Sequence, residues 1–132
     1  MKAVVDTNVL IFDTFEDSER HRDAASGLDS LEGWGLPSIV FHELVWFFRS
    51  RSVKISRAVT KVDELLTHEK TMFIPCTTDD VRFASSRLES YKKYNDLIVL
   101  SAAKRLSLPL FSFDEELEAT AKRNSIDLFE IQ

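Results

Sequence analysis

Short apolar segments alternate along this chain with longer segments of helical periodicity, and this alternation limits the possible folds more than any other feature. The strand-like segments are residues 2–5, 72–76, 108–113 and 127–131. The helical segments, with apolar side chains at offsets of three and four, cover residues 17–31, 38–48, 55–69, 77–91 and 95–106. Parallel strands need a crossover of about this length. The sequence therefore predicts an α/β fold with a mainly parallel sheet and helices on both faces.

Local signals at the ends of these segments refine the outline. Gly33 and Gly35 close the first helical segment, and a short link follows in which Ser38 is placed to cap the next helix. Thr77 opens a sequence that resembles a capping box, because the carboxylate of Asp80 can return a hydrogen bond to the Thr77 backbone. These signals predict helices that begin close to residues 38 and 77.

Length and composition favour one soluble domain over residues 1–132. A chain of 132 residues fits one compact core. No apolar run approaches the roughly 18 residues that span a bilayer, so we expect no membrane partner. Asp6 follows only three apolar residues, which argues against a secretory signal and for a cytoplasmic protein. Cys76 is the only cysteine, so no internal disulfide can form, and we expect its side chain in the core.

The charge balance bears on binding of nucleic acid. A net charge of −5 weighs against a partner held by diffuse positive potential, so a nucleic acid must be bound locally. Basic residues gather between residues 49 and 61 and at Lys92 and Lys93, where a solvated helix face is favoured over a phosphate-binding patch. Trp34 and Trp46 could stack on bases, but core packing is favoured for both.

Four acidic residues adjoin apolar sequence. Asp6 and Asp114 directly follow strand segments, and the carboxyl ends of parallel strands form the edge where such folds place their sites. Asp96 begins a helix after Asn95, and Glu43 interrupts an apolar helical series. Each acid taken singly has a structural explanation: an Asx turn at Asp6, helix caps at Asp96 and Asp114, or an exposed helix face at Glu43.

The four acids taken together indicate a metal site. Carboxylates that converge in a partly dry site repel one another unless a cation lies between them. A set of oxygen ligands suits Mg²⁺ or Mn²⁺, whereas Zn²⁺ prefers histidine or thiolate ligands. His21, His42 and His68 show no zinc-ligand spacing.

These residues resemble the PIN (PilT N-terminal) domain family, and more narrowly its small VapC-like members, over nearly the whole chain. Residues 5–10 (VDTNVL) are similar to the first motif of the family, and Glu43, in a helix after a short second strand, is similar to its second acid. Residues 95–103 (NDLIVLSAA) resemble the third motif. Residues 112–114 (SFD) resemble the fourth, with Ser112 where the family commonly has threonine.

The resemblance implies a three-layer α/β/α sandwich with a central, mainly parallel five-stranded sheet and an acidic pocket at its carboxyl edge. It also implies metal-dependent hydrolysis of RNA phosphodiester bonds with Mg²⁺ or Mn²⁺. The metal ligands and catalytic residues would be Asp6, Glu43, Asp96 and Asp114. Asn8 and Ser112 would orient the acids through hydrogen bonds, and Glu115 is a further candidate ligand.

The resemblance favours an endoribonuclease that is the toxin of a VapBC-type toxin–antitoxin pair, with an RNA substrate, an antitoxin partner and a homodimer formed through its helices. An RNA-processing or quality-control PIN nuclease is the alternative within the same chemistry. A non-catalytic PIN-like binding module is a third interpretation, against which the intact acids argue. A phosphotransferase of the haloacid dehalogenase type also begins with a strand ending in Asp, but it needs a second Asp where this chain has Asn8.

Overall fold

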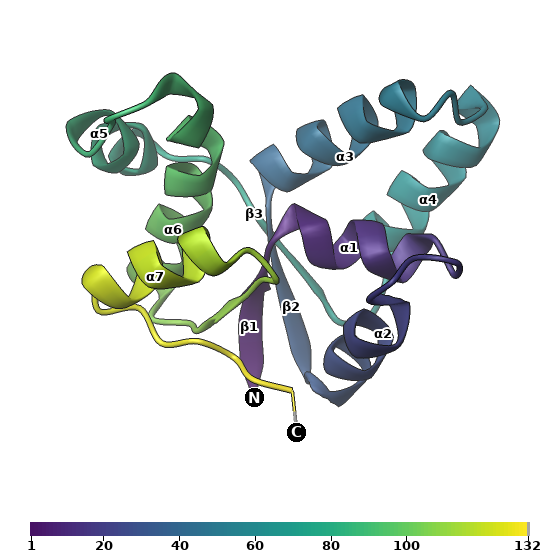
Figure 1. Cartoon of the computed structure of the whole chain (residues 1–132), viewed down its shortest axis with the longest axis horizontal. Helices are drawn as coiled ribbons and strands as arrows, with labels where there is room; N and C mark the ends of the chain where they lie inside the picture. The colour runs from purple at the N-terminus through teal and green to yellow at the C-terminus, as the bar shows by residue number, and fades with distance from the viewer. Residues whose placement is uncertain (132) are drawn as a thin grey trace.

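The structure, a computed structural model, describes residues 1–131 and has the predicted α/β architecture. Figure 1 shows a parallel sheet between two groups of helices, with α1 to α4 on one side and α5 to α7 on the other. The strands, in the spatial order β3-β2-β1-β4, are β1 (Lys2–Val5), β2 (Gly33–Pro37), β3 (Thr71–Ile74) and β4 (Leu110–Phe111). The helices are α1 (Thr7–Thr14), α2 (His21–Ser30), α3 (Ser38–Ser50), α4 (Ile55–Thr67), α5 (Thr78–Ser86), the 3₁₀ turn η1 (Tyr91–Lys93), α6 (Tyr94–Leu106) and α7 (Glu115–Arg123). Within residues 1–131, no helix has the length and apolar character needed to cross a bilayer.

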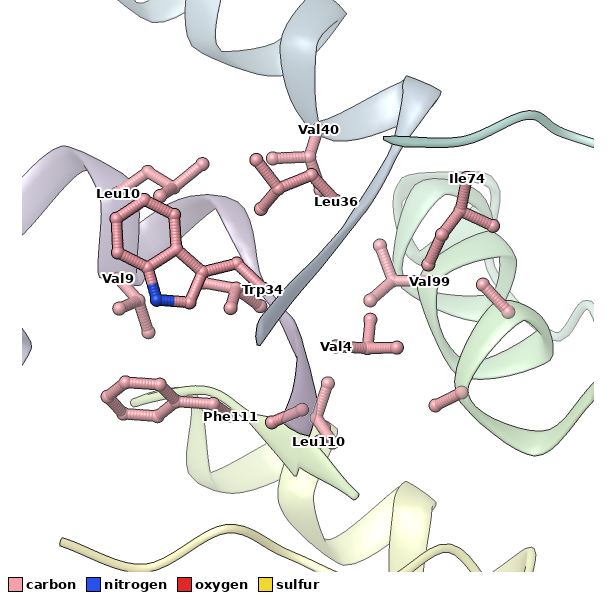
Figure 2. Packing of buried hydrophobic residues seen from close by; sticks show 14 of the residues in the cluster. Val4, Val9, Leu10, Trp34, Leu36, Val40, Ile74, Val99, Leu110 and Phe111 are labelled. Carbon is pink, nitrogen blue, oxygen red and sulfur yellow. The ribbon is translucent and has the colours of Figure 1, made fainter. Parts of the chain in front are cut away.

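The core lies on both faces of the sheet. The central strand β1 is buried from Ala3 to Val5, as expected for a parallel strand that is covered on both sides. In Figure 2, Val4 faces Val99 of α6 on one side of the sheet, while Trp34 and Phe111 lie on the other side toward α1. This packing fixes the carboxyl ends of β1 and β4 next to each other, because these two strands pair in parallel register.

The predicted fifth strand, residues 127–131, is only an isolated bridge. Leu128 pairs with Leu110, and the Phe129 amide donates to the Leu110 carbonyl at 2.8 Å. Because β4 is itself only two residues long, the ladder has no room to extend. The described part of the chain therefore has four strands rather than five.

Three further elements differ from the sequence prediction. Residues 33–37, which the local pattern indicated as a helix end and a link, form the fully buried strand β2; the family resemblance had implied a short second strand before Glu43. Gly35 permits this, because a Cβ at this position would lie 3.2 Å from Val4 and 3.3 Å from the Ala3 carbonyl oxygen of the neighbouring strand. Helices α1 and α7 were not predicted, since α1 is short and apolar on most sides and α7 is largely charged.

Three side chains do not lie where the sequence placed them. Ser38 does not cap α3; the cap is Pro37, and the Ser38 hydroxyl instead accepts a hydrogen bond from the Cys76 amide at 3.2 Å. Cys76 follows β3 and is exposed rather than buried. Trp34 is buried as predicted, but Trp46 on α3 is 61% exposed. The apolar series of α3 extends onto a face that is exposed within residues 1–131, so apolar character alone does not place Trp46 in the core.

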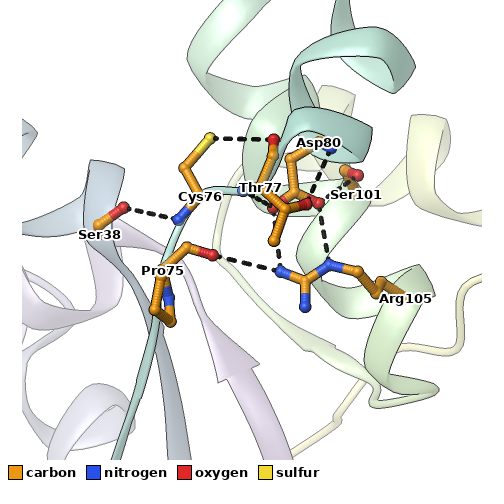
Figure 3. Close-up of polar contacts among 7 residues, drawn as sticks. All are labelled: Ser38, Pro75, Cys76, Thr77, Asp80, Ser101 and Arg105. Atoms are coloured by element: carbon orange, nitrogen blue, oxygen red, sulfur yellow. Dashed lines mark hydrogen bonds and ion pairs between the residues drawn. The ribbon is translucent and has the colours of Figure 1, made fainter.

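Asp80 is the buried centre of a polar network that joins α5 to α6 (Figure 3). The predicted capping box is present: the Thr77 hydroxyl accepts from the Asp80 amide, and the Thr77 amide donates to the Asp80 carboxylate. The same carboxylate accepts from the Ser101 hydroxyl at 2.7 Å and pairs with Arg105 at 3.0 Å. Asp80 therefore has a structural role that is separate from the acids considered below.

Even a methyl group at Gly27 is expected to destabilise the fold. It lies in α2, and a Cβ at this position would be 2.4 Å from the ring of Phe111, which is almost fully buried. Alanine stabilises an exposed helix by roughly 1 kcal/mol relative to glycine, but overpacking of a core costs typically 1–3 kcal/mol. We expect Gly27→Ala to lower the free energy of unfolding in urea by about 1–2 kcal/mol. Ser26→Ala, at an exposed position of the same helix, is the control and should change it by less than about 0.5 kcal/mol.

Candidate metal centre at the carboxyl edge of the sheet

Asp6 lies at the end of the central strand and is held on both carboxylate oxygens. It is the residue between β1 and α1, and its side chain is only 5% exposed. One oxygen accepts from the Thr7 amide and the other from the Ser112 hydroxyl, each at 2.8 Å. The bond from the Thr7 amide caps α1, and the two bonds together fix the orientation of the carboxylate.

Glu43 is brought to the same edge by α3, where it is half-buried rather than on an exposed face. Its Oε1 accepts from the Thr7 hydroxyl at 2.6 Å, and its Oε2 accepts from the Asn95 amide group at 3.5 Å. Sequence reasoning gave neither Thr7 nor Asn95 a role. The available signal was their position, since Thr7 directly follows Asp6 and Asn95 directly precedes Asp96.

Asp96 and Asp114 occupy two different helix starts, and both are half-buried. Asp114 caps α7, because its carboxylate accepts from the amides of Glu116 at 2.9 Å and Leu117 at 3.2 Å. Asp96 is not a cap: it lies within the first turn of α6, and the residue at the cap position is Lys93. A helix cap was the structural explanation for both acids, and only Asp114 is one.

Ser112 links the segment around Asp6 to the segment that carries Asp114. Besides donating to Asp6, its hydroxyl oxygen accepts from the Asp114 amide at 3.0 Å and from the Asn8 side-chain amide at 3.4 Å. The side-chain Oδ1 of Asn8 accepts from the Phe113 backbone amide at 3.3 Å. Asn8 and Ser112 thus tie the start of α1 to the segment that carries Asp114.

The four carboxylates influence one another electrostatically. Burial, together with the nearby charges of Asp96 and Glu43, raises the pKa of Asp6 to about 7. Burial also raises the pKa of Asp96 to about 6, with the charges of Asp114 and Glu43 adding to it. Asp6 and Asp96 therefore lie close enough to acids from other stretches of the chain for the charges of Glu43 and Asp114 to oppose their ionisation.

The donor set suits a hard divalent ion, although the side chains do not form a closed cage. All four groups offer carboxylate oxygens, which Mg²⁺ and Mn²⁺ prefer. A cation would favour the charged forms of Asp6 and Asp96, whose pKa values are raised by burial and then by the neighbouring acids. Within residues 1–131, no three acidic, histidine or cysteine side chains converge tightly enough to hold an ion as they stand. The chemistry of the donors fits a metal that keeps several of its waters.

Glu116 is a further acid near this group. Glu115, the candidate from the sequence, is exposed and lines a surface hollow with Ser112 and Phe113. Glu116 forms an ion pair with Lys93, and its charge contributes to the raised pKa of Asp96. Lys93 is thus a basic side chain close to the acids, and its charge lowers the pKa of Asp96 in part.

The raised pKa of Asp6 has a consequence for stability without divalent ions. Between about pH 4 and pH 7 the folded protein retains a proton that the unfolded chain, with an ordinary pKa of 3.8, has lost. The free energy of unfolding must then fall as the pH rises through this window and level off above it. We expect urea denaturation in EDTA to show this decline for the wild-type chain and a clearly smaller one for Asp6→Asn. Equal slopes for the two proteins would contradict the assignment.

A comparison with known protein families shows the family of this chain. The sequence profile of the PIN domain matches residues 3–123. The chain belongs to the PIN domain family. A comparison with curated proteins gave no significant sequence match.

Solved structures from several bacteria have the same fold. VapC20 of Mycobacterium tuberculosis, described as a sarcin-ricin-loop-cleaving toxin, superposes with a TM-score of 0.77 at 16% identity, covering 89% of this chain and 94% of that one. VapBC2 of Rickettsia felis, bound to a promoter DNA fragment, gives 0.69 at 21% identity, with 98% of each chain covered. FitAcB of Neisseria gonorrhoeae gives 0.65 at 18% identity, covering 98% of this chain and 97% of that one. At these identities the likeness establishes the PIN fold.

Proposed function

We propose that this PIN domain is a metal-dependent endoribonuclease that hydrolyses RNA phosphodiester bonds with Mg²⁺ or Mn²⁺. The observation that carries the proposal is that Asp6 and Asp96 are buried or half-buried beside further acids, so that burial and then the neighbouring charges raise their pKa values. Repelling acids in a partly buried site are costly unless they serve a cation. The carboxylates that would hold the ion are Asp6, Glu43, Asp96 and Asp114.

The surrounding residues would prepare this site rather than react themselves. A bound divalent ion would make a water molecule a better nucleophile and offset the negative charge that develops at the phosphate. Ser112 and the Thr7 amide hold the Asp6 oxygens in place, and the Thr7 hydroxyl does the same for Glu43. Such positioning of ligands by neighbouring hydrogen bonds commonly accounts for ten- to a hundredfold in metal affinity or activity.

We further propose that the protein is the toxin of a VapBC-type pair, with an antitoxin as its protein partner. The support is the similarity in fold to VapC20, whose description names cleavage of the sarcin-ricin loop, and to the VapBC complexes of R. felis and nontypeable Haemophilus influenzae. An RNA-processing role for the same chemistry is the alternative.

Incubation of the purified protein with a mixed RNA pool, in the presence of Mn²⁺ or of EDTA, tests the proposed activity. We expect cleavage only with Mn²⁺, and mapping of the cut ends then separates the two roles. Cuts confined to one structured RNA favour a toxin-like target, and cuts at the ends of many transcripts favour processing. RNA that stays intact with Mn²⁺ would overturn the proposed function.

A further inference from the structure

The carboxylate of Glu43 is held by side chains from two different helices. Its Oε1 accepts from the Thr7 hydroxyl, and its Oε2 accepts from the Asn95 side-chain amide. Thr7 begins α1, and Asn95 lies in the first turn of α6. These helices belong to the two groups on opposite sides of the sheet (Figure 1), so Glu43 connects the two groups across the acidic edge.

Thr7 makes the shorter of the two contacts. Its side chain is only 6% exposed, and the distance of 2.6 Å between its hydroxyl and Glu43 is typical of a hydroxyl that donates to a charged acceptor. The backbone amide of the same residue donates to Asp6 at 2.8 Å. Thr7 therefore contacts two of the four candidate ligands, and the placement of Asp6 relative to Glu43 depends on it.

Asn95 makes the longer contact, at 3.5 Å. An ionised carboxylate only accepts hydrogen bonds, so Asn95 must turn its NH₂ group rather than its oxygen toward Glu43. Asn95 is half-buried and directly precedes Asp96. The contact thus ties Glu43 to the turn of α6 that carries another candidate ligand, and its length predicts a smaller contribution than that of Thr7.

Two interpretations of this arrangement make different predictions. The hydrogen bonds could serve stability alone, by satisfying a half-buried carboxylate. They could also prepare Glu43 for an ion, because a glutamate side chain has several rotatable bonds and loses rotamer freedom when it binds. The second interpretation is favoured because the donors reach different oxygens, so the carboxylate cannot turn without loss of a contact.

We propose that Thr7 and Asn95 are positioning residues that orient Glu43 as a metal ligand, and that both affect metal affinity only through Glu43. One donor to each oxygen leaves each oxygen a further lone pair for a cation. Hydrogen bonds that orient ligands in this way commonly change metal affinity by about ten- to a hundredfold. The inference rests on the proposed function in taking a divalent cation as the ligand of the acidic edge.

Isothermal titration calorimetry with Mn²⁺, in the absence of RNA, tests the two residues. We expect Thr7→Val, which keeps the size of the side chain and removes the hydroxyl, to raise Kd roughly tenfold. Thr7→Ser restores the hydroxyl and should stay within about twofold of wild type, and Asn95→Ala should raise Kd about threefold. Thr14→Val is the matched control, because the Thr14 hydroxyl donates to the Leu10 carbonyl within α1; its Kd should not change.

The same titrations in a Glu43→Ala background separate positioning from a general effect on the fold. Glu43→Ala should itself weaken Mn²⁺ binding. If Thr7 and Asn95 act through Glu43, adding Thr7→Val or Asn95→Ala to it should change Kd by less than about twofold. A role in stability alone predicts the same factor with and without Glu43. Circular dichroism of each variant checks that the titrated protein is folded.

The inference is overturned if Thr7→Val or Asn95→Ala binds Mn²⁺ as tightly as wild type, if Thr7→Ser fails to restore binding, or if the effects persist without Glu43. RNA cleavage is scored separately. A protein that cuts RNA while Thr7→Val keeps full Mn²⁺ affinity retains the proposed function and loses this inference. A protein whose Mn²⁺ affinity depends on Thr7 and Asn95 but that leaves RNA intact retains this inference and loses the proposed function. A wild-type chain that binds no Mn²⁺ loses both.

Discussion

Replacing Asp6 or Asp96 with asparagine is expected to lower the rate of Mn²⁺-dependent RNA cleavage by at least about a thousandfold. Each change removes an anionic ligand from an ion that contributes several kcal/mol to stabilisation of the transition state, and each 1.4 kcal/mol corresponds to a factor of ten in rate. The fold should persist, because asparagine keeps the size of the side chain and can still accept the Thr7 amide at position 6. Single-turnover cleavage of one defined RNA measures the effect.

Asp17→Asn is the matched control for these variants. Asp17 is exposed in the segment between α1 and α2, and the same chemical change there should leave the cleavage rate within twofold. Circular dichroism of all three variants checks that the secondary structure is retained. Cleavage by Asp6→Asn or Asp96→Asn at the rate of Asp17→Asn would remove that residue from the site.

Loss of the Asp80 carboxylate is expected to have the largest effect on stability. Asp80→Ala removes the partner of Arg105, leaves the Ser101 hydroxyl without its acceptor and abolishes the capping box of α5. A lost cap costs about 1 kcal/mol and a broken buried ion pair roughly 3–5 kcal/mol. Because Arg105 is partly exposed, we expect the lower part of this range, a loss of about 3 kcal/mol in the free energy of unfolding by urea.

The neighbouring Asp79 provides the control for this change. Asp79→Ala alters an exposed acid in the same turn of α5 and should cost less than about 1 kcal/mol. If both alanine variants unfold at the same urea concentration, the network around Asp80 does not stabilise the protein as described.

The Asp80 network also predicts a dependence on acid. Burial alone would raise the pKa of Asp80, but the hydrogen bonds from Arg105, Thr77 and Ser101 outweigh it and hold the pKa below its ordinary value of 3.8. The network therefore stabilises the fold fully above about pH 4, and this contribution is lost as the pH falls through the lower pKa of the folded state. The effect lies at a lower pH than that of Asp6 and has the opposite sign, so the two are separable in one titration.

Periodicity predicted the elements that have strong and regular patterns. The helices that became α3, α4 and α6 and the central strand β1 each combine apolar spacing with a clear boundary, so local sequence and tertiary packing agree. β2 was misread because its sequence, GWGLP, has the glycines of a loop and the burial of a central strand. Its strand character comes from pairing with β1 and β3, which a local pattern cannot reveal.

In the candidate site too, local patterns could be predicted from the sequence and contacts between distant residues could not. The four candidate acids could be selected from the sequence because each adjoins apolar sequence and because the family motifs occur in the expected order. The hydrogen bonds of Thr7 and Asn95 to Glu43 could not be foreseen, since they join residues 36 and 52 positions apart. The same holds for the ion pair of Lys93 with Glu116, which depends on how α6 and α7 meet.

Isothermal titration calorimetry with Mn²⁺ tests most directly whether the acidic edge is a metal centre. We expect the folded wild-type chain to bind Mn²⁺ and Asp17→Asn to bind it equally well. Asp6→Asn and Asp96→Asn should each lose at least about tenfold in affinity for Mn²⁺. A folded wild-type protein that gives no heat of binding with Mn²⁺, or with Mg²⁺, would contradict the account.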